Sequence, residues 1–150
     1  MRTTQRMSAR AAATLVAALA LTLTGGGVAN AVKGGVPAIP LNNEQETTGA
    51  NTGASGFFSY EIEGNQLCYV LEVRDLSQDA VAAHIHLAPR NVAGDVVVPL
   101  AIGVGTSWTV DTCTTADPAL LAAIEENPRS YYVNVHTPTF PGGEVRGQLK

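Results

Sequence analysis

The stretch YYVNVHTPTFPGGEVRGQLK, residues 131–150, is the part of the chain that decides the predicted fold. It begins with a run of β-branched and aromatic residues, continues through a Pro- and Gly-rich cluster, and ends with a short second run at residues 144–149. β-Branched and aromatic residues are enriched in strands, whereas Pro and Gly mark turns. The pattern therefore predicts a β-hairpin with a six-residue connection, residues 138–143.

A second stretch, AAHIHLAPRNVAGDVVVPL at residues 82–100, shares its chemistry with this hairpin. Side chains alternate between the two faces of a strand, so His84 and His86 lie on one face of the strand that begins this stretch. The same alternation places His136 on a face with Asn134 and Tyr132. These are all three histidines of the chain, so any site hypothesis begins with these two segments.

Further strands are predicted from alternating apolar and polar residues. Residues 57–73 alternate on both sides of Gly64-Asn65, a pair that suits a two-residue turn, and so predict a hairpin. Shorter strands are expected over residues 96–100 and 106–112. With about seven short strands and no alternation of strands with helices, the sequence predicts an all-β antiparallel sandwich.

A single helix signal interrupts this pattern near residue 120. Asp117 is a good N-cap, Pro118 fits the first helical position, and Leu120, Leu121 and Ile124 fall on one side. Asn127-Pro128 ends the segment, so we expect one short helix between strands.

The beginning of the chain is predicted to be a signal peptide, residues 1–31. Three arginines precede an apolar run at residues 11–24, and Ala-Asn-Ala at residues 29–31 supplies a cleavage pattern. An uncleaved signal anchor is the alternative, although the apolar run is short for a membrane span. We expect a secreted or cell-envelope protein with no transmembrane segment in the mature chain.

After cleavage, we expect a flexible leader at residues 32–55, with a possible short strand at 36–41, and a single domain at residues 56–150. The mature chain would carry 6 basic and 13 acidic residues, a net charge of 6 − 13 = −7. Such a charge disfavours binding to nucleic acid or to an anionic membrane.

The only two cysteines, Cys68 and Cys113, are predicted to form a disulfide, because exported proteins fold in an oxidising compartment. Such a bond would staple one sheet to the other. Two buried free thiols are the alternative.

Four motifs resemble the CHRD domain. They are His-x-His at residues 84–86, the following Gly and valine run, Tyr-x-Asn-x-His-Thr at residues 132–137, and Pro-Gly-Gly-Glu-x-Arg-Gly-Gln at residues 141–148. The resemblance spans residues 56–149. It implies an immunoglobulin-like or superoxide-dismutase-like β-sandwich of a type found in exported bacterial proteins, and it implies no particular activity.

The likeness of this family to copper/zinc superoxide dismutases raises the question of a metal. His84 and His86 match the paired strand histidines of a dismutase, and His136 stands in for its distant histidine. The chain has no fourth histidine to bridge two metals, so a dinuclear redox site is not expected.

Two interpretations of the histidines remain open. In the first, His84, His86 and His136 hold one zinc or copper ion, to which Asp95 or Glu144 adds an oxygen ligand.

In the second interpretation, the imidazoles belong to a structural hydrogen-bond network with Asn134, Tyr132 and Thr137. Glu144 and Arg146, two residues apart, could join it as an ion pair.

No catalytic residue is assigned, because no serine lies in a nucleophile context and Gly142-Gly143 is better explained by a turn. The sequence favours a non-catalytic extracellular or envelope binding module whose partner it does not name. A metal-binding protein using zinc or copper is the alternative function.

Overall fold

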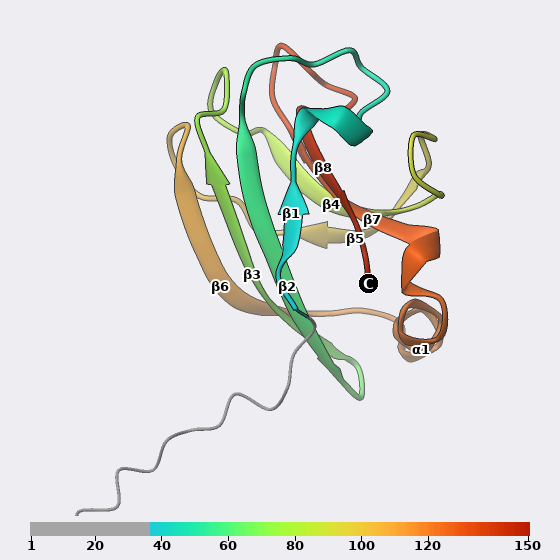
Figure 1. Ribbon diagram of the computed structural model, residues 1–150. Helices are drawn as coiled ribbons and strands as arrows, with labels where there is room; N and C mark the ends of the chain where they lie inside the picture. The colour runs from blue at the N-terminus through green and yellow to red at the C-terminus, as the bar shows by residue number, and fades with distance from the viewer. Residues whose placement is uncertain (1–36) are drawn as a thin grey trace, which may run out of the picture. The chain divides into compact units, whose positions relative to one another are not determined.

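The computed structural model describes residues 37–150 and shows two antiparallel sheets of four strands each (Figure 1). The strand order is β1-β2-β3-β6 in the first sheet and β5-β4-β7-β8 in the second. The strands are β1 Ile39–Leu41, β2 Ser55–Glu63, β3 Gln66–Arg74, β4 Ala82–Leu87, β5 Asp95–Leu100, β6 Trp108–Thr115, β7 Tyr131–His136 and β8 Val145–Gln148. The predicted all-β sandwich is confirmed. The predicted signal peptide, residues 1–31, lies outside the described residues.

The predicted hairpin over residues 57–73 is formed by β2 and β3. Gly64 has φ +62°, in the left-handed region that glycine adopts at no steric cost, and it turns the chain between the two strands. Phe58, Leu67 and Leu71 are fully buried and belong to the core between the sheets. Apolar alternation therefore selects the core face of this hairpin correctly.

The single helix, α1 Pro118–Glu126, also follows the prediction. The Asp117 side chain accepts hydrogen bonds from the main-chain amides of Ala119 and Leu120, at 2.7 and 3.3 Å. Two short 3₁₀ turns, η1 Asn43–Gln45 and η2 Pro128–Ser130, complete the elements. Among residues 37–150, no helix has the length and apolar character needed to cross a membrane.

The region predicted to be a flexible leader, residues 32–55, contributes to the sandwich from residue 39 onward. β1 pairs with β2 at the edge of the first sheet, and its Ile39 and Leu41 side chains are buried in the core. Two apolar side chains suffice here because both face inward, and Pro40 is tolerated because β1 is an edge strand. The folded domain therefore begins well before residue 56.

The end of β1 also joins the two sheets. Asn42 and Arg146 exchange main-chain hydrogen bonds of 3.1 and 3.0 Å, which connect the first sheet to β8 of the second. Gly147 permits this approach, since a Cβ atom at that position would lie only 2.7 Å from the Pro40 carbonyl oxygen. One long edge of the sandwich is thereby closed.

The predicted disulfide between Cys68 and Cys113 is present. It does not staple one sheet to the other, because the two cysteines are directly paired partners on β3 and β6 of the same sheet. Leu67 and Tyr69 face the core, so Cys68 between them faces outward. The bond instead locks the register of two neighbouring strands.

Removing this bond should lower stability without changing the fold. The disulfide closes a loop of 45 residues, which corresponds to about 4 kcal/mol of unfolding free energy on the chain-entropy account. We expect a Cys68→Ala/Cys113→Ala variant to lose about that amount in urea denaturation. Reduced wild type is the control and should unfold like the variant; equal stability of oxidised wild type and variant would contradict the assignment.

Candidate functional site

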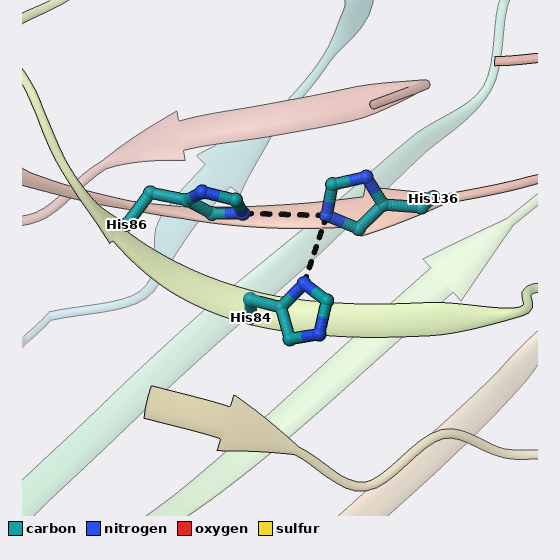
Figure 2. A group of neighbouring side chains, drawn as sticks. All are labelled: His84, His86 and His136. Carbon is teal, nitrogen blue, oxygen red and sulfur yellow. Dashed lines mark hydrogen bonds between the residues drawn. The ribbon is translucent and has the colours of Figure 1, made fainter. Parts of the chain in front are cut away.

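The three histidines of the chain meet on the outer face of the second sheet (Figure 2). β4 supplies His84 and His86, and the neighbouring strand β7 supplies His136. Nδ1 of His84 lies 3.1 Å from Nε2 of His136, and Nε2 of His86 lies 3.3 Å from that same nitrogen. Segments about fifty residues apart in the sequence therefore bring three imidazoles into contact.

Main-chain carbonyls determine the tautomer of two of these rings. Nδ1 of His86 lies 2.9 Å from the Gly94 carbonyl oxygen, and Nδ1 of His136 lies 3.0 Å from that of Pro141. A carbonyl oxygen only accepts, so each Nδ1 carries the proton and donates it. In a neutral imidazole the other nitrogen, Nε2, then bears a lone pair. Two lone-pair nitrogens thus face each other across 3.3 Å.

The environment keeps the three imidazoles neutral. Burial lowers the pKa of His84 and of His86, and it lowers the pKa of His136 to about 4. For His136, the hydrogen bond to Pro141 acts in the opposite direction, while the neighbouring imidazoles lower its pKa further. At neutral pH the cluster therefore offers lone pairs with no excess proton between them.

The nitrogen spacing suits a metal ion. Zinc binds histidine nitrogen at about 2.0–2.1 Å with tetrahedral geometry, which places two ligand nitrogens about 3.4 Å apart. The contacts of His136 with His84 and His86, at 3.1 and 3.3 Å, match this spacing. The three candidate ligand atoms lie within 4.8 Å of one another, so the half-buried His84 has to move toward His86 for all three to share one ion.

Two side chains of β7 hold the loops that provide these carbonyls. The Tyr132 hydroxyl accepts a hydrogen bond of 3.1 Å from the Gly94 amide. The Asn134 side-chain amide donates to the Gly142 carbonyl at 3.2 Å. Gly143 has φ +126°, and a Cβ atom there would lie 2.3 Å from the Asn134 side chain. Glycine is therefore required where the second loop passes over the sheet.

Arg146 of β8 holds the loop between β4 and β5, which carries the Gly94 carbonyl. Its guanidinium is fully buried and donates 2.8 Å hydrogen bonds to the carbonyls of Val92 and Pro89. It also stacks on the Tyr132 ring, 3.3 Å from the ring centroid, while His86 stacks parallel to Tyr132 at 4.8 Å. The guanidinium, the phenol and the imidazole thus form one continuous packed row across β8, β7 and β4.

Arg146 forms no ion pair with any carboxylate of residues 37–150. A half-buried carboxyl group, that of Glu46, contributes to the charge environment of the guanidinium. Burial raises the pKa of Glu46 to about 7, against the lowering effects of Arg146, a main-chain bond at Thr47 and the Asn134 side chain. Near neutral pH Glu46 is therefore only partly ionised, and main-chain carbonyls remain the direct partners of the guanidinium.

Glu144, just before β8, is a second fully buried charged residue, and its carboxylate contacts different loops from those that contact Arg146. Its carboxylate accepts 2.8 Å hydrogen bonds from the amide and hydroxyl of Ser77 and from the hydroxyls of Thr52 and Thr137. Burial alone would raise the pKa of Glu144, but these donors outweigh it and hold its pKa below the ordinary 4.5. Glu144 therefore ties three separate loops to the start of β8.

Comparison with known proteins assigns the described domain to a family. The CHRD domain family matches residues 38–149, a range that contains all eight strands and the three histidines. The chain belongs to the CHRD-domain family. No curated protein and no solved structure matches it. The described sandwich and the CHRD domain are thus one unit.

The structure separates the six candidate residues of this CHRD domain into three groups. The imidazoles come together, and Asn134 lies beside them as a loop anchor. The expected ion pair of Glu144 with Arg146 is not formed, because their side chains bond to different loops. Asp95 and Glu144, expected as oxygen ligands, are absent from the group of possible metal ligands among the described residues.

Several partners in the site carry no sequence signal. The carbonyls of Gly94 and Pro141 orient two imidazoles, yet every residue has a carbonyl group. Ser77 and Thr52 contact Glu144 from distant loops, and nothing in their local sequence distinguishes them from surface residues.

Replacing Glu144 should make the CHRD domain less stable and less sensitive to acid. A group with a lowered folded-state pKa stabilises the protein above its ordinary pKa, and this contribution disappears as the pH falls through the folded-state value. We expect Glu144→Gln to lose about 1–3 kcal/mol of unfolding free energy at pH 7. The difference from wild type should shrink below pH 4.5, the ordinary pKa of the carboxyl group.

Urea denaturation between pH 3 and pH 7 measures this effect. Glu126→Gln, at the exposed end of α1, is the matched control and should leave the pH profile unchanged. A constant difference between Glu144→Gln and wild type at all pH values would contradict the role assigned to the carboxylate.

Arg146→Lys should also be costly, although it keeps the positive charge. The planar guanidinium donates to two carbonyls at once, and an ammonium group cannot reproduce that geometry while stacking on Tyr132. We expect a loss of about 2–4 kcal/mol in unfolding free energy. Arg74→Lys, in the exposed ion pair with Glu72, should cost under about 1 kcal/mol. Similar losses in both variants would show that the buried geometry is unimportant.

Proposed function

We propose that this CHRD-domain protein binds one zinc or copper ion through Nδ1 of His84 and Nε2 of His86 and His136. The observation that carries the proposal is the tautomer assignment. Nδ1–H of His86 and of His136 each donate to a carbonyl oxygen, so the Nε2 atoms of both rings carry lone pairs, and these converge at 3.3 Å. Convergent lone pairs in a buried place need a cation between them or a donor for each.

The surroundings of the imidazoles support the same proposal. Histidines that bind metals usually donate their second ring N–H to a carbonyl or carboxylate, which orients the ring and raises its basicity. His86 and His136 both have such a partner, at 2.9 and 3.0 Å. Neutral imidazole is the form that binds metal, and burial favours that form at all three positions.

A purely structural network explains less of the geometry. If Nδ1 of His84 carries a proton, it can donate to Nε2 of His136 at 3.1 Å. Nε2 of His86 would then have no donor among the described residues. A buried acceptor left without a partner costs about 1–3 kcal/mol, and one shared cation removes that cost.

The donor set defines the class of ion. Imidazole nitrogen suits zinc and copper, whereas magnesium and calcium prefer oxygen ligands. Three protein ligands leave a fourth coordination position for solvent or for another molecule. When bound, the ion would supply a positive centre with one exchangeable position, held in a rigid frame of strands.

We further propose that this binding takes place outside the cytoplasm, in an exported protein. The arginines, apolar run and Ala-Asn-Ala pattern of residues 1–31 support export. The disulfide between Cys68 and Cys113 fits an extracellular protein, because such bonds persist in oxidising compartments. The protein would thus act as an extracellular or cell-envelope binding module, with the ion as its ligand at this site.

Metal content tests the proposal directly. Protein purified without a chelator or an affinity tag should contain about one zinc or copper ion per chain by elemental analysis, or should take up one when it is supplied. We expect His136→Ala to abolish this binding. Metal at 100 times its dissociation constant should stabilise wild type by about 2.7 kcal/mol and leave His136→Ala unaffected.

The Cys68→Ala/Cys113→Ala variant is the control, because it is destabilised in the other sheet and keeps all three imidazoles. It should retain the full metal content, which separates loss of a ligand from loss of stability. Wild type that takes up neither ion, together with a His136→Ala variant of reduced stability, would favour the structural network instead.

A further inference from the structure

A groove of about 380 Å³ lies on the surface near the end of the chain. Ile39, Pro40 and Leu149 are the apolar residues that line it. In Figure 1, the label C marks the end of the chain, just after β8. The volume lies within the range of small-molecule sites, about 300–1,000 Å³.

The groove concentrates positive charge in an acidic domain. Residues 37–150 contain 5 basic and 13 acidic residues, a net charge of 5 − 13 = −8. Three of those five, Arg90, Arg129 and Lys150, line the groove, and no acidic side chain does. The other two basic residues lie outside the groove: Arg74 forms an ion pair with Glu72, and Arg146 is buried. The free cationic side chains of the described domain are thus all in one place.

These three side chains are exposed and form no hydrogen bond or ion pair with any described residue. The side-chain amide oxygens of the groove each already accept a hydrogen bond from within the domain. Oε1 of Gln45 accepts from the main-chain N–H of Gln148 at 3.3 Å, and Oε1 of Gln148 accepts from the Arg146 guanidinium at 3.3 Å.

The main chain at the end of the groove is also partly occupied, because the Lys150 carbonyl oxygen accepts from the Tyr60 hydroxyl at 3.2 Å. The unpartnered polar side-chain atoms of the groove are therefore hydrogen-bond donors: two guanidinium groups, one ammonium group and the Nε2 of Gln45. A ligand that matches them must present acceptors.

We propose that this groove binds a small organic anion that carries at least two carboxylate, sulfate or phosphate groups. Guanidinium groups recognise such oxyanions through paired hydrogen bonds. More than one anionic group is required, because the cations come from three separate segments: the loop after β4, the η2 turn and the end of β8. The apolar part of the lining calls for a ligand with a carbon skeleton rather than a bare inorganic ion.

The experiment is a calorimetric titration at low ionic strength, where exposed charges are least screened. The probes are propane-1,2,3-tricarboxylate, a disaccharide with two sulfate groups, and inorganic phosphate. We expect one of the two organic anions to bind with 1:1 stoichiometry, and the preferred probe distinguishes a carboxylate from a sulfate ligand. Arg90→Gln and Arg129→Gln should each weaken binding about tenfold or more, the equivalent of one charged hydrogen-bonded contact.

Arg74→Gln is the matched control, since it removes one arginine outside the groove and should leave binding unchanged. The titration is repeated with His136→Ala to exclude an anion that acts through a metal ion. Equal weakening by Arg74→Gln would overturn the proposal as nonspecific attraction. Absence of binding by both organic anions, binding of phosphate equal to theirs, or loss of binding in His136→Ala would also overturn it, and none of these results bears on metal content.

Discussion

The burial of the Arg146 guanidinium is the constraint on which the site depends. Removing a charge from water is expensive, and no carboxylate among residues 37–150 forms an ion pair with it. The cost is offset by the carbonyls of Pro89 and Val92 and by the face of Tyr132. These carbonyls can reach the guanidinium only when the loop after β4 folds over the sheet. The same loop position places the Gly94 carbonyl against His86. The buried guanidinium and the histidine cluster therefore depend on one loop, the loop between β4 and β5.

Loops cover the outer face of the second sheet, so alternating side chains there do not divide into buried and exposed. A sandwich strand usually buries one face and exposes the other, yet all six residues of β7 are buried. Val133 and Val135 face the core, while Tyr132, Asn134 and His136 face the loops that cover the outer surface. Polar residues on that face are therefore interior residues. Because they are buried, their hydrogen bonds determine where the loops lie.

This difference explains how much could be predicted from the sequence. The β2–β3 hairpin and the Asp117 cap followed from local patterns, and alternation showed that His84 and His86 share a face. The cysteine pair followed from the presence of only two cysteines in a chain expected to be exported. The approach of His136 depends on β4 and β7 being neighbours, a pairing that periodicity does not encode. A short strand at residues 36–41 was expected, but Ile39 and Leu41 alone do not show that it pairs with β2, so the domain was expected to begin only at residue 56. The disulfide was expected to join sheets because the partner strand of β3 was unknown.

The meeting of the two ends of the domain has a consequence for when this protein can acquire its structure. The Asn43 side chain bonds to the Glu144 carbonyl, 101 positions away, and His86 meets His136 across 50 positions. Contacts of such long range slow folding, because closing a large loop costs chain entropy before the contacts form and stabilise the fold. A ribosome-bound fragment that lacks the last twenty residues has no seventh or eighth strand and only two imidazoles. The two sheets can therefore close on each other only after β7 and β8 have both been synthesised, so the domain folds as one late cooperative unit rather than strand by strand.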